Sequence, residues 1–131
     1  MSLIVQRYLA FAGVFGRPAV WNYHLLFTGG LRNGSEDPWM RISASQQSFV
    51  EPPARLFLIE SSKFGLPFSA FYNYVGSQAT FKVWLAGLVT VVNSDGPQMN
   101  QSETVTLLND MLLLAPATLV DPAIRWEELD R

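Results

Sequence analysis

Residues 54–92 read ARLFLIESSKFGLPFSAFYNYVGSQATFKVWLAGLVTVV. Apolar side chains occupy alternating faces along this stretch, and short clusters around Gly65 and Gly76 interrupt the pattern. Alternation broken by such clusters is typical of consecutive β-strands joined by tight turns. We therefore expect three strands here, with Gly87 marking a bend or bulge in the last and longest one; they cover residues 54–61, 67–75 and 79–92.

Two more strands precede this stretch. Residues 20–28 alternate with a period of two until Gly29-Gly30, and residues 39–50 do so until Pro52-Pro53. No helical segment separates consecutive strands, which excludes a parallel α/β sheet because its strands need crossover connections. The pattern predicts five strands in an antiparallel meander.

Helical periodicity is found at the two ends of the chain. Residues 3–12 place Ile4, Tyr8 and Phe11 at helical spacing. Near the other end, Asn100 and Glu103 have the spacing of a capping box, ahead of an apolar stripe over residues 105–115, and a further helical turn is expected from Asp121-Pro122. The predicted fold is α+β: one domain over residues 1–131, a curved five-stranded half-barrel with these helices packed on one face.

Composition excludes several classes of function. Charged residues make up 15% of the chain and the net charge is −2 without a basic run, which argues against binding to nucleic acid. The absence of cysteine excludes disulfides and thiolate metal sites, and a single histidine excludes histidine clusters, so we expect no metal and no cofactor. No window is apolar enough for a membrane span. Arg7 lies inside the apolar N-terminal segment, which argues against a signal peptide and leaves a cytoplasmic or periplasmic location open.

Candidate catalytic groups are few. His24 has only Asn22 and Leu26 as neighbours at two-residue spacing, so nothing local would orient its ring for acid–base chemistry. Glu51 and Glu60 stand at strand ends, where solvated carboxylates are the simpler interpretation. No nucleophile elbow or phosphate-binding loop occurs. We therefore predict that the protein is not an enzyme.

Four of the five predicted strands carry apolar side chains on both faces, more than two short helices can cover. We expect a slot for a hydrophobic or lipid-like ligand, with Arg41, Gln47 or Arg55 at its rim for a polar head group. The alternatives are a self-associating domain whose second apolar face is a homodimer interface, and ordinary core packing on both faces. The candidate wall residues of the slot are Trp21, Tyr23, Phe57, Phe71, Tyr72, Phe81 and Trp84.

Several short motifs resemble a bacterial family of unknown function. They include Phe27-Thr28-Gly29, Pro53-Ala54-Arg55-Leu56-Phe57, Gly65-Leu66-Pro67, Leu107-Leu108-Asn109-Asp110 and Trp126. The resemblance implies no activity and no catalytic residues. It also implies that members continue with more strands after the last of these motifs, which would make this chain a fragment. The order of elements is similar to that of the periplasmic lipoprotein carriers, in which a curved sheet embraces helices and a lipid slot, although a fold does not by itself confer a function.

Overall fold

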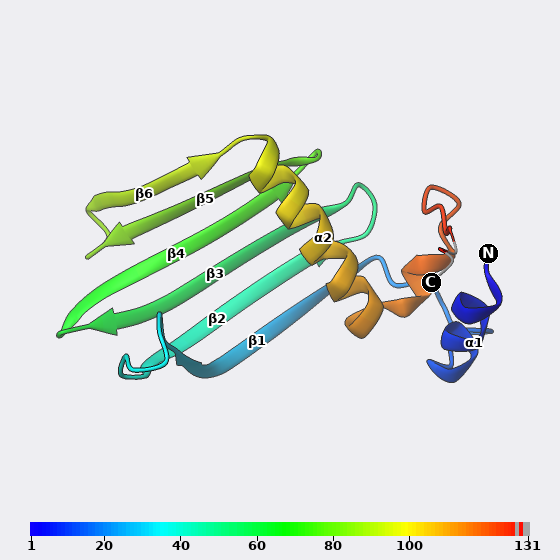
Figure 1. Ribbon diagram of the computed structural model, residues 1–131, viewed down its shortest axis with the longest axis horizontal. Helices are drawn as coiled ribbons and strands as arrows, with labels where there is room; N and C mark the ends of the chain where they lie inside the picture. Colours follow the sequence, from blue (N-terminus) through cyan, green and yellow to red (C-terminus); the bar gives the residue numbers. More distant parts are fainter. Residues whose placement is uncertain (128, 130–131) are drawn as a thin grey trace.

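The computed structural model describes residues 1–127 and 129 and contains an open antiparallel sheet of six strands in sequence order (Figure 1). This confirms the α+β meander, but the strand count is six rather than five. The strands are β1 (Asn22–Leu31), β2 (Met40–Phe49), β3 (Ala54–Lys63), β4 (Leu66–Val75), β5 (Gln78–Leu85) and β6 (Val89–Asp95).

The extra strand arises at Gly87, where we expected only a bend or bulge. Ala86 and Gly87 have φ angles of 51° and 69°, and the Leu88 amide donates to the Leu85 carbonyl at 3.1 Å. Two consecutive left-handed residues closed by such a bond form the turn that suits a two-residue hairpin. The expected long strand over residues 79–92 is therefore two strands. Alanine rarely adopts this conformation, whereas glycine does so readily. Only one of the two turn residues, Gly87, therefore indicates a turn in the sequence.

Helix α2 (Pro97–Leu114) crosses one end of the sheet, and α1 (Leu3–Phe11) lies beyond that end, near the 3₁₀ helix η1 (Pro116–Val120) (Figure 1). The structure corrects both predicted helix starts. Asn100 lies inside α2, where its side chain accepts a hydrogen bond from the Ala79 amide at 2.7 Å instead of capping the helix. From Asp121 the described residues form a single turn and no helix. The Ile124 amide donates to the Asp121 carbonyl at 3.0 Å, and the Asp121 carboxylate accepts from the Ala123 amide at 2.7 Å.

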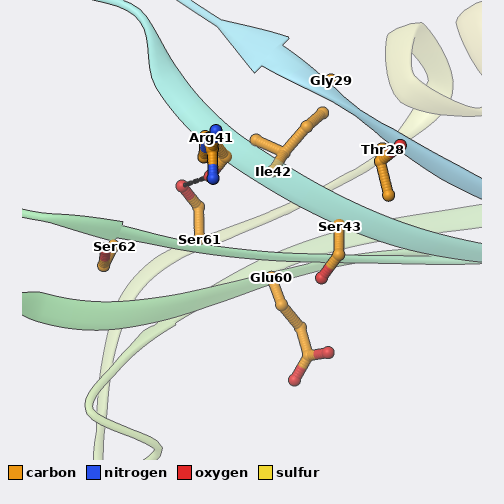
Figure 2. Close-up of a pocket in the computed structure, with 8 residues that line it drawn as sticks. All are labelled: Thr28, Gly29, Arg41, Ile42, Ser43, Glu60, Ser61 and Ser62. Atoms are coloured by element: carbon orange, nitrogen blue, oxygen red, sulfur yellow. Dashed lines mark hydrogen bonds between the residues drawn. The ribbon is translucent and has the colours of Figure 1, made fainter.

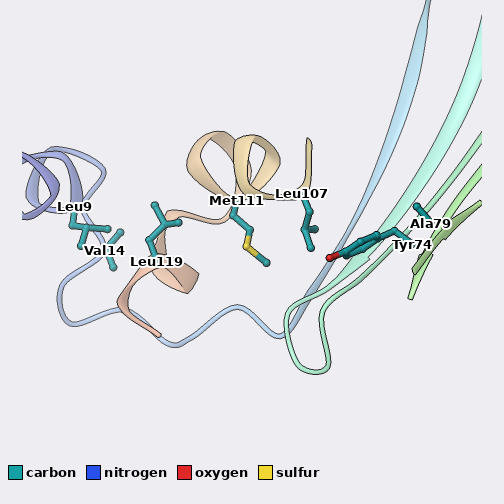
Figure 3. Close-up of a cluster of buried hydrophobic side chains, with 7 residues drawn as sticks. All are labelled: Leu9, Val14, Tyr74, Ala79, Leu107, Met111 and Leu119. Atoms are coloured by element: carbon teal, nitrogen blue, oxygen red, sulfur yellow. The ribbon is translucent and has the colours of Figure 1, made fainter. Parts of the chain in front are cut away.

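The hydrophobic core is small and lies at the α2 end of the sheet. Leu9 of α1 and Leu119 of η1 are both 0% exposed and face each other, and the cluster continues through α2 to the sheet (Figure 3). The Tyr8 hydroxyl donates to the Leu112 carbonyl and joins α1 to α2. The N-terminal helix thus reaches the core through α2 and η1. The buried members of the cluster are Leu9, Val14, Tyr74, Ala79, Leu107, Met111 and Leu119.

None of the helices in the described part of the chain has both the length and the apolar character that a membrane crossing requires.

Candidate functional site

The strand register divides the sheet into two chemically different faces. Arg55 on β3 is paired with Ser48 on β2 and Tyr74 on β4, and its side chain contacts α2, which identifies the helix-side face. Residues of the same parity on each strand belong to this face. It is almost continuously apolar beyond α2, with Leu25, Phe27, Leu31, Met40, Ile42, Ala44, Phe57, Ile59, Phe68, Ala70, Tyr72, Phe81, Val83, Leu85 and Val92.

The opposite face, here called the outer face, is mixed. Apolar side chains on it come from β1 to β5, with Leu26 as much as 77% exposed. Polar residues surround them, so the apolar character expected on both faces is concentrated on the helix-side face. The polar residues of the outer face include His24, Ser43, Gln47, Glu60, Ser69, Asn73 and Lys82.

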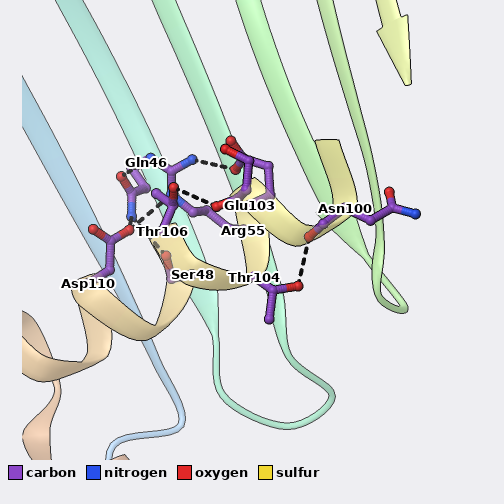
Figure 4. A network of polar contacts seen from close by, with 9 residues as sticks. Gln46, Ser48, Arg55, Asn100, Glu103, Thr104, Thr106 and Asp110 are labelled. Carbon is purple, nitrogen blue, oxygen red and sulfur yellow. Dashed lines mark hydrogen bonds and ion pairs between the residues drawn. The ribbon is translucent and has the colours of Figure 1, made fainter. Parts of the chain in front are cut away.

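A buried polar network holds α2 on the sheet (Figure 4). The Arg55 guanidinium contacts Glu103 at 3.0 Å through Nη1 and Asp110 at 2.9 Å through Nε, and its side chain is 8% exposed. Gln46 accepts from Arg55 at 3.2 Å and donates to Asp110 at 2.7 Å and to Ser48 at 3.0 Å. Glu103 and Asp110 are two turns apart on α2, so they project from one side of the helix. Arg55, a predicted head-group ligand, is therefore engaged by α2.

Two tyrosines border this network. The Tyr23 hydroxyl is buried and has no hydrogen-bond partner among the described residues. Burial raises the pKa of Tyr23 above its usual value. The nearby Ser48 side chain opposes this rise, the Asp110 carboxylate adds to it, and Arg55 opposes it. Burial likewise raises the pKa of Tyr72, with Glu103 contributing in the same direction. Both phenols are therefore held in their neutral form.

Tyr23→Phe tests this environment. Because the pKa of Tyr23 is raised in the folded state, its phenol does not affect the free energy of unfolding below the unfolded-state pKa of about 10. Above that pH the unfolded chain loses its proton first, and the free energy of unfolding falls. We expect the variant to lose less stability between about pH 9 and pH 11 than the wild type, by at most about 1.4 kcal/mol per pH unit for one proton. Urea unfolding at both pH values measures this difference.

At neutral pH, Tyr23→Phe should change stability by less than about 0.5 kcal/mol, because the hydroxyl that it removes lies near the Ser48 side chain but makes no hydrogen bond to any of the described residues. Tyr74→Phe is the matched control, since the Tyr74 hydroxyl pairs with Thr104 at 2.8 Å, and we expect it to cost about 1 kcal/mol. An alkaline loss in Tyr23→Phe equal to that of the wild type would show that the Tyr23 phenol ionises normally.

An aromatic ladder crosses the helix-side face. Phe57 meets Phe27 edge-on at 5.9 Å between ring centroids and stacks with Tyr72 at 6.2 Å, and Tyr72 stacks with Phe81 at 4.1 Å. Such pairs add about 0.5–1.5 kcal/mol each beyond the area they bury. The ladder forms a continuous apolar floor across the sheet, from β1 to β5.

Next to the ladder, on the part of the sheet that α2 leaves uncovered, lies an apolar hollow of about 360 Å³. Tyr72 and Phe81 belong to both the ladder and the hollow, and Lys63 is the one charged residue in its lining. We call this site the apolar hollow. Its lining residues are Leu31, Asn33, Met40, Ile59, Lys63, Phe68, Ala70, Tyr72, Phe81, Val83 and Val92.

A larger depression, about 840 Å³, lies across β1, β2 and β3 (Figure 2). Its lining is mostly polar, and the Glu60 side chain points away from Arg41. The one hydrogen bond drawn between lining residues is the Ser61 hydroxyl donating to the Arg41 carbonyl at 2.6 Å. We find no set of groups in it that converges on a single point, so the apolar hollow is the better candidate site.

The predicted site residues are divided between the faces. Tyr23, Arg55, Phe57, Tyr72 and Phe81 lie on the helix-side face, and the last two line the apolar hollow. Trp21 precedes β1 and lies in a separate depression beside η1. The structure does not bring the others to the hollow, because their parity places them on the outer face; they are Arg41, Gln47, Phe71 and Trp84.

The candidate catalytic groups lie apart from one another. His24 is exposed, and its Nε2 is 2.9 Å from the Ser45 hydroxyl. Glu51 and Glu60 are exposed as well. Among the described residues, no cluster of His, Cys, Asp or Glu side chains could hold a metal ion.

Sequence reasoning missed Lys63 and the α2 carboxylates. The predicted strand ends at Ser61 and leaves Lys63 outside it. In the structure Lys63 ends β3 with the same parity as Ile59 and Ser61, which places it on the helix-side face. Continuing the alternation of the predicted strand by two residues, from Ser61 to Lys63, would have placed Lys63 on this face. Glu103 was read as a helix cap, and only its distance to Arg55 shows otherwise.

Fold and site together define the class: a small α+β protein whose open antiparallel sheet carries an apolar hollow beside a helix held down by an ion-pair network. The chain belongs to a family of unknown function, because the family model described as "Family of unknown function (DUF6544)" matches residues 3–131. This confirms the resemblance drawn from the sequence motifs. No curated protein and no solved structure matches the chain, so the likeness to lipoprotein carriers stays a prediction.

Proposed function

We propose that the protein binds a hydrophobic, lipid-like molecule in the apolar hollow without catalysing a reaction. The observation that carries the proposal is the hollow itself, about 360 Å³ in volume and lined mainly by aliphatic and aromatic side chains. Small-molecule sites have volumes of this order and the same predominantly apolar lining, with a few polar groups for orientation.

Solvent exposure of the surrounding side chains supports the proposal. Leu31 and Val92, which line the hollow on opposite edge strands, are each about 40% exposed. Soluble monomers rarely leave a large contiguous apolar patch in contact with water. A ligand that covers these side chains gains about 25 cal/mol for each Å² of apolar surface removed from water, before the cost of association.

The proposal is tested on edge strand β6 with two neighbouring substitutions. Val92 lines the hollow, whereas Asn93 lies on the outer face, and both are exposed enough to accept glutamate without unfolding the sheet. We expect Nile red to gain fluorescence on binding wild-type protein and to be displaced by dodecanol. Val92→Glu should weaken dodecanol binding at least tenfold because it places a charge in the apolar lining, and Asn93→Glu should leave binding unchanged.

Absence of Nile red uptake by the wild type at micromolar protein, or equal binding by both variants, would contradict the proposal.

Self-association is the second candidate, and the open edge of the sheet favours it. Val89, Val91 and Val92 on β6 are 57%, 54% and 40% exposed, and no charged residue precedes Asp95 on this strand. An unprotected edge of this kind can pair with another chain. Light scattering separates the two candidates: a stable dimer without dye uptake favours self-association, and a monomer that binds dye favours the ligand.

A further inference from the structure

The two ends of the helix-side face carry opposite charge. Beneath α2, the two carboxylates of Glu103 and Asp110 share the single guanidinium of Arg55, which leaves this end with an excess negative charge. At the other end, Lys63 is the one charged residue that lines the apolar hollow. The face is therefore electrically asymmetric along its strands.

Lys63 is free to meet a ligand. Neither ion pair in the described part of the chain involves it, and its recorded contact is with the ring of Phe64, 5.7 Å from the ring centroid. It is exposed at the last position of β3, so its side chain is accessible to a ligand. An exposed ammonium group in this position attracts an anionic ligand, and the contact requires no charge to be buried.

The surroundings of Lys63 add polar groups. A second depression of about 330 Å³ adjoins the apolar hollow and shares Asn33, Met40 and Lys63 with it. Asp37 and Arg41 also line this second depression, but the parity of Arg41 places it on the outer face, so Lys63 is the cationic residue that the two depressions share. Where the apolar lining ends, the Lys63 ammonium and the Asn33 amide can therefore both donate hydrogen bonds to a ligand.

The length of the apolar path suits an extended chain. Phe57 in the aromatic ladder and Lys63 are six residues apart on β3, which corresponds to about 20 Å of strand. The side chains between them on the helix-side face are Ile59 and Ser61. A ligand lying along this path would have one end beside the ladder and the other at Lys63.

We infer that the ligand is a single-chain amphiphile with an anionic head group, bound with its head at Lys63 and Asn33 and its tail along the apolar hollow toward the aromatic ladder. This inference rests on the proposed function and deepens it by naming the class of ligand. The excess negative charge beneath α2 disfavours the reverse orientation.

The test compares dodecanoate with dodecanol, which share a tail and differ in head-group charge, as competitors of Nile red at about pH 8, where the carboxylate is ionised. Wild-type protein should bind dodecanoate about three- to fivefold more tightly than dodecanol, the most that one exposed ion pair provides. Lys63→Gln should abolish this preference, and Lys63→Glu should reverse it. Lys82→Gln is the matched control, because Lys82 is exposed on the outer face, and it should retain the preference.

The outcomes separate the two claims. Equal affinity for both competitors in the wild type, or a preference for dodecanoate that persists in Lys63→Glu, overturns the anionic head group while leaving the hydrophobic site in place. Failure of both competitors, together with no uptake of Nile red, overturns the proposed function itself. Loss of the preference in Lys82→Gln as well would show a general charge effect and would also overturn the role of Lys63.

Discussion

Replacing Arg55 with methionine is expected to lower the free energy of unfolding by about 3–5 kcal/mol, because it leaves Glu103 and Asp110 without their cation. The Glu103 side chain is only 6% exposed, so water cannot replace the guanidinium there. Methionine has a similar length and no charge, which isolates the electrostatic loss from a loss of packing. Urea unfolding at neutral pH, compared with the wild type, gives the value.

Two further variants complete this experiment. Arg41→Met removes an exposed arginine of the outer face and should change stability by less than about 0.5 kcal/mol. Adding Glu103→Gln and Asp110→Asn to Arg55→Met removes the uncompensated charges and should recover most of the loss. A loss below about 1 kcal/mol in Arg55→Met alone would show that the network is solvated and does not hold α2 in place.

Truncating Leu119 to alanine is expected to cost about 2–5 kcal/mol. Leu119 is 0% exposed and faces Leu9, so its side chain joins η1 to α1 within the small core. The loss falls within this range according to how far the neighbouring apolar side chains close the cavity. Thermal and urea unfolding measure the loss, and amide hydrogen exchange in α1 should accelerate at the same time.

Leu113→Ala serves as its control, since Leu113 is in α2 but 81% exposed, and it should change stability by less than about 0.5 kcal/mol. Similar losses of stability in Leu119→Ala and Leu113→Ala would show that the contact between η1 and α1 contributes no more to the free energy of unfolding than an exposed leucine does.

The meander could be predicted from the sequence because strand periodicity and hairpin turns are local properties. Phe64-Gly65 and Gly76-Ser77 both adopt positive φ angles in two-residue turns, and each contains a glycine at a break in the alternation. Ala86-Gly87 adopts the same conformation, but it lies within a long apolar run that continues on both sides. The sixth strand was missed there because the hydrophobic pattern outweighed one glycine.

The site was less predictable, because it depends on where α2 lies on the sheet. Tyr72 and Phe81 are both predicted wall residues, and the structure places both in the apolar hollow. Parity could not tell which face α2 covers, so Phe71 and Trp84 of the outer face were grouped with them. The ion pair between Arg55 and Glu103 joins residues that are 48 positions apart in the chain, which no local pattern shows.

The core and the polar network both lie at one end of the sheet, so the strands are anchored there. No helix of the described residues covers their other halves. A guest molecule could therefore reach the aliphatic floor directly from the surrounding medium. Loading and release would require no hinge or gate, and their rates would be set by the contacts that the guest makes and loses.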